Sequence, residues 1–356
     1  MPASHPSKDD AAQATAKPRL YHGERGFSQY AASMAVTAAG PNRVNPDIGW
    51  WFGGAAPDPS AAYAHSSRAR GTARAMVVPW HHWGKVSAVQ VDPVAVRVME
   101  TIAEVGGSMM REGLAGDLAV EAKSHPSDLV TQVDRNIETR ARAIAAETLP
   151  GYGFLGEEAG GASARSGWLW VVDPLDGTAN YANRIQHAAV SVGLCHDGRA
   201  VAGIILDPFR GEKFVAAGDG RATAGGRALA VRAQDDFMGG LVLMELGGKE
   251  DPGPEALALF GRVRRSGGVC RVMGSAALSL AYVAAGRAAA ALMLRVSAWD
   301  VAAGLALVEA AGGIGVRPAD GAPYDVLEGG PLVAGSPQAV RRLRGLLGAS
   351  QGQLVQ

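Results

Sequence analysis

Six acidic residues share one kind of position in this sequence, the end of an apolar run or the expected start of a helix: Asp134, Glu157, Glu158, Asp173, Asp176 and Asp300. Asp173 directly follows the apolar run "WLWVV", and Asp176 comes three residues later. Two such carboxylates repel one another unless a positive group, usually a metal ion, lies between them. Taken singly, each also has a structural explanation, because Asp134 can complete a capping box with Thr131 and Asp300 can stabilise a helix start.

The segment "DPLDGT", residues 173–178, has the residues that end a strand and begin a helix. Pro174 prevents regular continuation of the strand, and Gly177 allows a close backbone approach. The N–H groups of Gly177 and Thr178 then fall at a helix start, where unpaired N–H groups bind phosphate oxygens. Carboxylates beside a phosphate require divalent cations, and oxygen ligands without clustered His or Cys favour magnesium over zinc.

The surrounding pattern predicts elements that would place these residues at strand ends and helix starts. A helix is expected after Asp92 and Pro93, which supply an N-cap and a first-turn proline, and another after the cap Thr131. Turn pairs at 197–198, 210–211 and 219–220 indicate an antiparallel meander. Beyond residue 240, strands and helices alternate at 241–247, 274–286, 289–294, 299–313 and 331–336, before a basic C-terminal helix. Sheets covered by helices account for this mixture.

Composition limits the classes of partner. The chain has 356 residues, 47% of them hydrophobic, and its 34 basic residues balance 34 acidic ones, so no overall field favours nucleic acid or a membrane surface. Two cysteines, Cys195 and Cys270, are too few for a disulfide framework and indicate a reducing compartment. No run of about 18 apolar residues and no signal-peptide pattern occurs. We therefore expect a cytoplasmic protein that needs neither nucleic acid nor a membrane.

Residues 1–89 differ from the rest because they are rich in Ala, Ser, Pro, Gly, Arg and His without sustained periodicity. They are interpreted as a weakly ordered N-terminal extension, with Met76 as an alternative start. His81 and His82 lie between two tryptophans, and a hydrophobic clasp is favoured there over a metal site. We predict an N-terminal α+β half over 90–238, with most of the acidic cluster, and a C-terminal α/β half over 239–350, with Asp300.

Five segments in matching order resemble the inositol monophosphatase family of magnesium-dependent, lithium-sensitive phosphomonoesterases: "KSHPSDLVTQVD", "GEE", "WVVDPLDGTANYANRIQHAAVSVGL", "GSAALSLAYVAAG" and "WDVAAGLALVEAAGG". The resemblance covers residue 90 to the C-terminal helix. It implies an α/β (α+β) fold, a layered αβαβα sandwich of the inositol monophosphatase and fructose-1,6-bisphosphatase type. It also implies a homodimer and hydrolysis of a small phosphorylated metabolite, with release of inorganic phosphate.

The resemblance further implies a site with two to three Mg²⁺ ions per subunit. Glu157, Asp173 and the backbone carbonyl of Leu175 match the ligands of the first ion. Asp173, Asp176 and Asp300 match those of the second, so that Asp173 bridges. One ion would lower the pKa of the attacking water and the other would stabilise the leaving alkoxide.

The other site residues come from the same resemblance. Thr178, hydrogen-bonded to Asp134, matches the pair that works with Glu157 to orient and activate water. Lys123 corresponds to a lysine near the metal cluster. Gly177 and Thr178 would hold the phosphate, next to Asp176. No phosphoenzyme is expected.

One position departs from the family pattern. Members specific for inositol phosphates carry a glutamate seven residues before the aspartate of "WD", and this chain has Met293 there, with Arg295 nearby. A thioether cannot replace a carboxylate as acceptor for a sugar hydroxyl, and the loss would cost about 1.5–3 kcal/mol. Arg295 could meet a second anionic group of the substrate, or it could be a solvated loop arginine. Histidinol phosphate, a nucleotide 3′,5′-bisphosphate and fructose bisphosphate are therefore alternatives to inositol 1-phosphate.

Two other functions compete with this one. Haloacid-dehalogenase-like phosphatases also place two aspartates and Gly-Thr at a strand end, but with one residue between the aspartates instead of the two found here, and without a "GEE" segment. Some bacterial relatives are regulatory proteins that bind the transcription or ribosomal-RNA maturation machinery. The complete ligand set favours catalysis.

Overall fold

The computed structural model describes residues 89–123, 125, 129–161, 165–233, 239–246 and 253–348. Apart from residue 89, the expected extension and its histidine pair lie outside these residues. The described chain contains two large sheets with helices on their faces. None of the helices in these ranges combines the length and apolarity that a membrane span requires.

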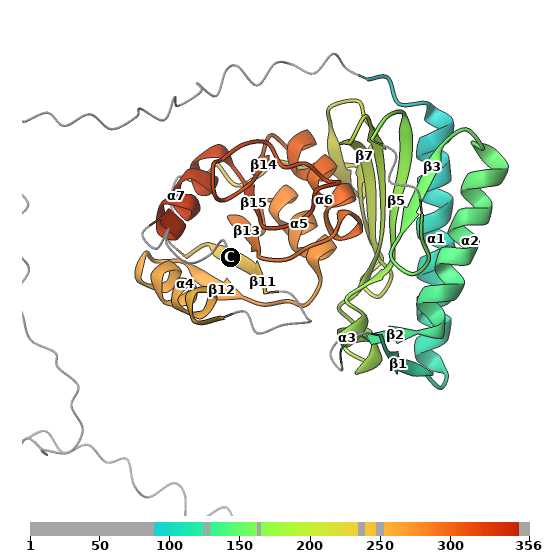
Figure 1. Cartoon of the computed structure of the whole chain (residues 1–356), viewed down its shortest axis with the longest axis horizontal. Coiled ribbons are helices and arrows are strands. Elements are labelled where there is room, and N and C mark those ends of the chain that lie inside the picture. The colour runs from blue at the N-terminus through green and yellow to red at the C-terminus, as the bar shows by residue number, and fades with distance from the viewer. Residues whose placement is uncertain are drawn as a thin grey trace, which may run out of the picture. The chain divides into compact units, whose positions relative to one another are not determined.

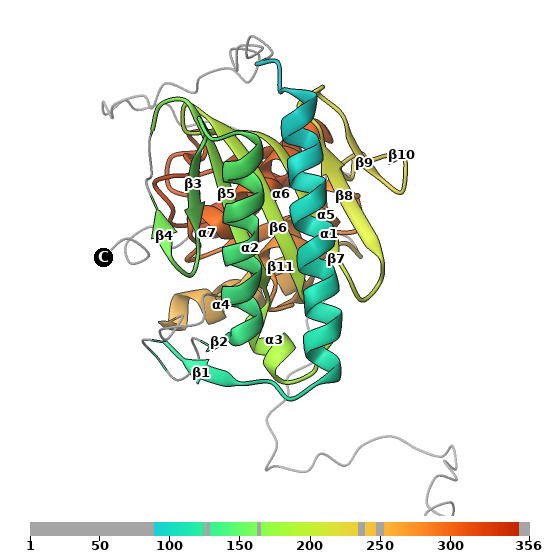
Figure 2. The same ribbon diagram turned by 90° about the vertical axis from the view of Figure 1, so that its right-hand side faces the viewer.

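Two helices, α1 (Pro93–Ala115) and α2 (Gln132–Thr148), begin where the sequence predicts. The Asp92 side chain accepts the Val94 N–H at 2.8 Å, and Thr131 and Asp134 form a capping box at the start of α2. Figure 2 shows the two helices side by side across one face of the larger sheet. They bury Met99, Ile102 and Ile137 against it, so the caps fix where the apolar faces meet the strands.

The larger sheet has eight strands in the order β10-β9-β8-β7-β6-β5-β3-β4. Their bounds are β3 Gly153–Gly156, β4 Gly160–Gly161, β5 Trp168–Asp176, β6 Ala189–His196, β7 Arg199–Asp207, β8 Glu212–Ala216, β9 Ala222–Ala224 and β10 Arg227–Ala228. The predicted meander is confirmed, since strands β5 to β10 pair antiparallel in chain order. Only β3 and β5 run parallel.

The prediction that Pro174 prevents regular continuation of the strand is confirmed, although the strand does not end there. Strand β5 continues to Asp176, with a register shift against β6 between Asp173 and Asp176. Proline has no N–H to donate, so it interrupts the ladder, and the chain absorbs the interruption as an irregularity of the bulge kind. Asp173 and Asp176 thus both belong to the end of one strand.

Short elements complete the N-terminal part. Strands β1 (Val120–Ala122) and β2 (Leu129–Thr131) form an antiparallel pair, and α3 (Thr178–Ala182) follows Gly177 directly. The helix start expected at Gly177 and Thr178 is therefore confirmed.

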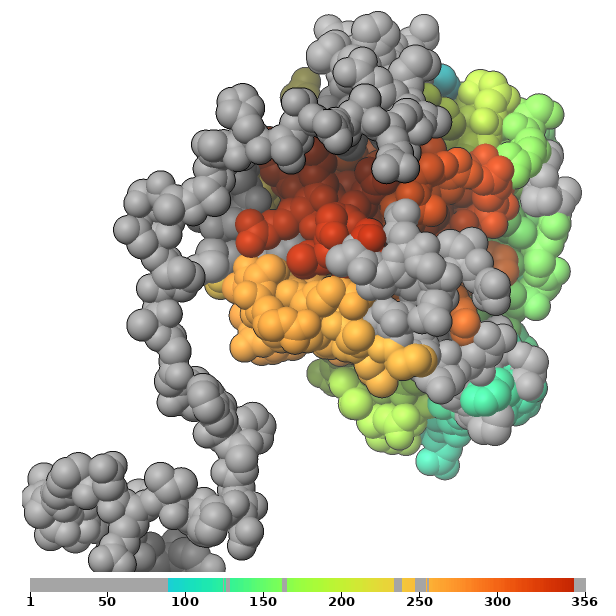
Figure 3. All heavy atoms as spheres, turned by 60° about the vertical axis from the view of Figure 1, so that its left-hand side comes forward, coloured from blue at the N-terminus to red at the C-terminus, as the bar shows by residue number. Residues whose placement is uncertain are grey.

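The smaller sheet has five strands in the order β12-β11-β13-β15-β14. Their bounds are β11 Leu241–Glu245, β12 Val269–Arg271, β13 Ala290–Met293, β14 Ile314–Val316 and β15 Leu332–Gly335. The helices of this part are α4 Gly253–Arg265, α5 Ala276–Ala284, α6 Ala298–Ala310 and α7 Pro337–Gly348. Helices α4 and α7 share one hydrophobic cluster with the sheet, and Figure 3 shows them next to each other on the surface.

Helices α5 and α6 lie between the two sheets (Figure 1). The layers approach closely because the contact residues are small. A Cβ placed on Gly203 of β7 would lie 2.6 Å from Cα of Ala303, and one on Gly193 of β6 would lie 2.6 Å from Cβ of Ala302. Helix pair, sheet, helix pair, sheet and helix pair give the αβαβα layering that the resemblance implies.

Candidate active site

Asp173 lies at the centre of the candidate site and has 2% of its surface exposed. Its Oδ1 accepts the Leu175 N–H at 3.0 Å. Burial raises the pKa of Asp173 well above its ordinary value, and the charges of Glu157, Asp176 and Asp300 raise it further. The fold therefore brings together four carboxylates from β5, from the turn after β3 and from the start of α6.

Asp176, also at the end of β5, is held by the first residues of α5. Its Oδ2 accepts the Ser275 hydroxyl and the Ala277 N–H at 3.1 Å, and its Oδ1 accepts the Ala276 N–H at 3.0 Å. Burial raises the pKa of Asp176 to about 7, although the Ser275 hydrogen bond opposes the rise. A carboxylate of the larger sheet is thus fixed by a helix of the C-terminal part.

Glu157 follows β3 and pairs with Lys123, which follows β1. The Lys123 Nζ lies 2.9 Å from Glu157 Oε1 and 2.6 Å from Glu158 Oε1. Burial alone would lower the pKa of Lys123, but attraction to Glu157 and Glu158 outweighs it and raises this pKa. Lys123 therefore stays charged and holds the two glutamates of one turn.

The predicted hydrogen bond between Thr178 and Asp134 is confirmed. Thr178 Oγ1 lies 3.1 Å from Asp134 Oδ1 and 2.9 Å from the Leu175 carbonyl oxygen. Asp134 is fully buried and also accepts the N–H and hydroxyl of Thr131. Burial raises the pKa of Asp134, and the hydrogen bonds from Thr131 and Thr178 oppose that rise. Asp134 therefore both completes the cap of α2 and accepts the hydrogen bond from Thr178.

Asp300 and Gly177 each combine a local structural role with a place in the site. Asp300 Oδ2 accepts the Ser297 N–H at 2.6 Å at the start of α6. Gly177 has a φ of 88°, and a Cβ there would lie 2.9 Å from the His187 carbonyl oxygen. Glycine is favoured here because the backbone is left-handed and because a side chain would collide with the His187 carbonyl just before β6.

The donor set has the chemistry that Mg²⁺ prefers, since it consists of carboxylate and carbonyl oxygens. Within the residues described, no three acidic, His or Cys side chains form a finished coordination group. The mutual repulsion that raises the pKa of Asp173 is nevertheless the interaction that a cation relieves. The residues therefore fit a divalent metal.

Met293 and Arg295 differ in exposure. Met293 ends β13, opposite Glu245 of β11 and Leu332 of β15, and it is fully buried in the hydrophobic cluster between the sheets. Arg295 is exposed. Contact of either residue with a substrate stays a prediction.

Sequence reasoning did not single out Ser275, Glu245 or Glu138. Ser275 holds Asp176, and Glu245 accepts the Ser279 hydroxyl at 2.9 Å and the Gly274 N–H at 3.2 Å, so it anchors the chain before α5. Glu138 is 2% exposed and lies on the buried side of α2 with Ile137, Ala141 and Ala145. That glutamate on a buried face is the one signal the sequence offers.

The chain matches the model of the inositol monophosphatase family over residues 90–352. It is 38% identical over 251 residues to an inositol-1-monophosphatase of Mesorhizobium japonicum, covering 69% of this chain and 92% of that one. It is 37% identical over 223 residues to Nus factor SuhB of Pseudomonas aeruginosa, covering 61% and 81%.

Solved structures agree with this match. The structure of extragenic suppressor protein suhB from Bartonella henselae has a TM-score of 0.67 and 30% identity, covering 72% of this chain and 99% of that one. An inositol monophosphatase from Anabaena has a TM-score of 0.64 and 28% identity, covering 72% and 95%. Inositol monophosphatases are phosphoric monoester hydrolases that depend on metal ions, generally Mg²⁺. The chain therefore belongs to the inositol monophosphatase family of phosphatases.

Proposed function

We propose that this phosphatase hydrolyses a small, inositol-1-phosphate-like phosphate monoester with Mg²⁺ as its metal and releases inorganic phosphate. The observation that carries the proposal is the repulsion of the buried Asp173 carboxylate by Glu157, Asp176 and Asp300. Such a gathering lowers stability unless cations offset it.

The predicted ligands divide between two principal ions, within a total of two to three per subunit. Glu157, Asp173 and the Leu175 carbonyl would hold one, and Asp173, Asp176 and Asp300 the other. When bound, Mg²⁺ would neutralise the charge of the phosphate ester and favour deprotonation of the attacking water.

The chain's own groups would orient the reactants. Asp134 accepts a hydrogen bond from Thr178, which leaves the lone pairs of the Thr178 oxygen to accept a hydrogen from water. Glu157 would accept the proton that the water loses. The N–H groups of Gly177 and Thr178, at the start of α3, would hold the phosphate oxygens, and Lys123 would add positive charge near Glu157.

Direct attack by water is favoured over a phosphoenzyme. An aspartyl-phosphate mechanism would need Asp173 as a free nucleophile, yet this side chain is 2% exposed and accepts the Leu175 N–H. Burst kinetics or a trapped aspartyl-phosphate would overturn this part of the proposal.

The identity of the alcohol depends on the C-terminal part. Because Met293 is buried among apolar side chains, it offers no acceptor for an inositol hydroxyl. Histidinol phosphate, a nucleotide 3′,5′-bisphosphate and fructose bisphosphate stay as alternative substrates. Inhibition by lithium, a homodimer and a cytoplasmic location belong to the same proposal.

A second function is a regulatory one. The observation in its favour is the 37% identity to a protein named Nus factor SuhB. The Asp176→Asn variant separates the two functions in a growth assay of a strain that lacks this protein. Full rescue by an inactive variant would favour a binding role over catalysis.

The test of the main proposal is phosphate release from a substrate panel with and without Mg²⁺. The panel contains inositol phosphates, histidinol phosphate, fructose bisphosphate, nucleotide bisphosphates and glycerol phosphate, and Asp173→Asn serves as the inactive control. We expect Mg²⁺-dependent release from at least one compound. Release from none would contradict the proposal.

A further inference from the structure

The turn that carries Glu157 is short and lies between two strands. Strand β3 ends at Gly156 and β4 begins at Gly160. Strand β4 has two residues and lies at the edge of the sheet, so the ladder alone holds this turn weakly. The place of the Glu157 carboxylate therefore depends on what fixes the turn's backbone.

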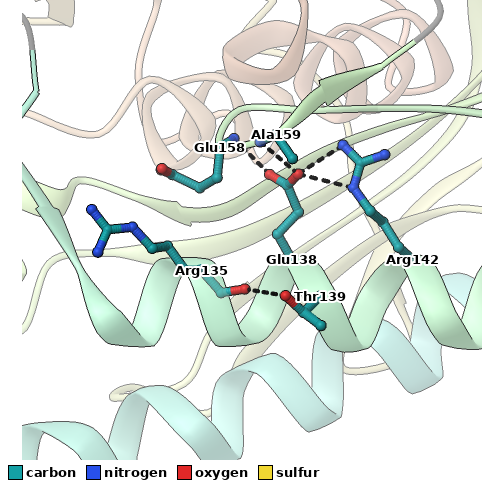
Figure 4. A pocket seen from close by; sticks show the side chains of 6 residues that line it. All are labelled: Arg135, Glu138, Thr139, Arg142, Glu158 and Ala159. Carbon is teal, nitrogen blue, oxygen red and sulfur yellow. Dashed lines mark hydrogen bonds and ion pairs between the residues drawn. The ribbon is translucent and has the colours of Figure 1, made fainter.

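Glu138 of α2 accepts two backbone N–H groups of this turn (Figure 4). Its Oε2 accepts the Glu158 N–H at 2.6 Å, and its Oε1 accepts the Ala159 N–H at 2.9 Å. Both donors directly follow Glu157 in the chain. Hydrogen bonds to a charged acceptor are among the strongest in proteins, and this acceptor is buried, so water does not compete for the two N–H groups.

Arg142 completes the arrangement one helical turn along α2. Its Nη2 and Nε lie 2.7 and 3.0 Å from Glu138 Oε1, and its Nη2 also donates to the Gly160 carbonyl. The guanidinium lies over the Phe154 ring of β3, 4.4 Å from the ring centre. Arg142 thus neutralises Glu138 and links it to the strands on both sides of the turn.

Gly156 leaves the space that the Glu138 carboxylate occupies. A Cβ on Gly156 would lie 2.5 Å from Cδ of Glu138. Gly156 directly precedes Glu157. Its lack of a side chain therefore lets the Glu138 carboxylate pack against the base of the turn.

Lys123 contacts the same turn through the side chains of Glu157 and Glu158. The buried Glu138 carboxylate therefore holds the N–H groups of the turn, and the Lys123 ammonium group holds its carboxylates. The residues drawn in Figure 4 also line a cavity of about 280 Å³. This space would allow the turn to move if the hold of Glu138 were lost.

We propose that Glu138 is a positioning residue that sets the place of Glu157 through the N–H groups of residues 158 and 159. The inference rests on the proposed function, in which Glu157 is a metal ligand. Glu138 itself touches neither substrate nor metal. Its removal should weaken Mg²⁺ binding by an amount that loss of stability alone does not explain.

The test compares Glu138→Gln with wild type in the full-length chain. Glutamine keeps one acceptor oxygen but presents an NH₂ group where the second N–H points, so one hold on the turn is lost. We expect the Mg²⁺ dissociation constant from calorimetry, and the Mg²⁺ concentration for half-maximal phosphate release, to rise about 10- to 100-fold.

Asp207 offers a matched control. It is fully buried, accepts the Phe209 and Arg210 N–H groups at 3.0 Å each, and pairs with Arg210 at 2.7 Å. The turn it holds, between β7 and β8, carries none of the predicted ligands. Asp207→Asn should lower the unfolding temperature as Glu138→Gln does, yet leave the Mg²⁺ affinity within about twofold of wild type.

Gly156→Ala keeps every charge, but its added methyl group would displace the Glu138 carboxylate. It therefore tests the inference even if Glu138→Gln does not fold. We expect its Mg²⁺ affinity to fall about three- to tenfold. Wild-type affinity in a folded Glu138→Gln or Gly156→Ala, or an equal loss in Asp207→Asn, would overturn the positioning role. If wild type itself bound no Mg²⁺ and released no phosphate, the proposed function would fail instead.

Discussion

The two sheets contribute differently to the site. The eight-stranded sheet carries Asp173 and Asp176 on β5 and Glu157 after β3, all at positions where the family resemblance implies acidic ligands. The five-stranded part supplies Asp300 at the start of α6, but places Met293 where inositol-specific members have a glutamate. The larger sheet thus carries three of the four predicted carboxylate ligands, and the smaller part supplies the fourth but departs from the pattern at Met293.

This difference separates the reaction from the choice of substrate. The acidic residues of the larger sheet lower stability by their burial and mutual repulsion, as the raised pKa of Asp173 indicates. Residues that destabilise a fold and are still present point to chemistry. Met293 stabilises the core by packing. We infer that the larger sheet together with Asp300 determines the reaction, and that the region around β13 determines the alcohol.

The largest expected effect is that of Asp173→Asn. Removing the central charge should lower phosphate release about a thousandfold or more, because this residue is predicted to serve both ions. The metal-free unfolding temperature should stay equal or rise, since repulsion by Glu157, Asp176 and Asp300 is relieved. Phosphate assays and thermal unfolding in a chelator measure both. An active variant, or one that unfolds far more easily, would contradict the role assigned to the larger sheet.

The next effect tests the contribution of the smaller part. Asp300→Asn should lower phosphate release about a hundredfold. Asparagine keeps an oxygen for the Ser297 N–H, so the unfolding temperature should change by only about 2 °C. Loss of activity through unfolding would instead assign Asp300 to the helix cap alone. A folded variant with wild-type activity would confine the chemistry to the larger sheet.

The sequence predicts those parts of the fold whose signals are local. Asp92 with Pro93 and the box of Thr131 and Asp134 locate two helix starts, and turn pairs such as Asp197-Gly198 locate the hairpins. Helix α4 was missed because it begins at Gly253 and contains Gly261, although Leu259 and Val263 repeat at helical spacing. The exposed strand β1 shows no alternation of burial that a pattern could reveal.

The candidate site is predictable as a set of residues but not as a network. Asp176 is held by Ser275 and by the N–H groups of Ala276 and Ala277, about a hundred residues away, and nothing in the local pattern indicates that contact. Glu138 and the turn after Glu157 are likewise joined only by tertiary packing. Caps and turns depend on neighbouring residues and can be predicted from local sequence, whereas hydrogen bonds between layers depend on the tertiary fold and cannot.

A smaller effect would sharpen the role of the substrate side. Met293→Glu should shift the preference toward inositol 1-phosphate by about tenfold, since it restores a charged acceptor for a hydroxyl. It should also lower the free energy of unfolding by about 2–3 kcal/mol, because the position is fully buried. Met293→Gln is the control with similar shape and no charge. An unchanged preference in a folded Met293→Glu would place the selectivity outside β13.

The smallest effect is on stability and concerns the point where the two regions meet. Burial raises the pKa of Asp176 to about 7 in the folded chain, against about 3.9 when unfolded. Between these values the folded state binds more protons than the unfolded state, so stability falls as pH rises. Below about pH 4 both states are protonated and the contribution is fully present.

Metal-free wild type should therefore lose on the order of 2 kcal/mol between about pH 5 and 7. Asp176→Asn should lose less, with the remaining slope due to Asp173, whose pKa is raised in the same direction. Adding Mg²⁺ at about pH 8 should restore the unfolding temperature of wild type and not that of the variant. Thermal unfolding across this pH range, with chelator or Mg²⁺, measures the effect. Equal slopes in wild type and Asp176→Asn would mean that the contacts of Asp176 with α5 already offset its burial and that the cost lies with Asp173. A flat wild-type curve would mean that neither carboxylate lowers stability.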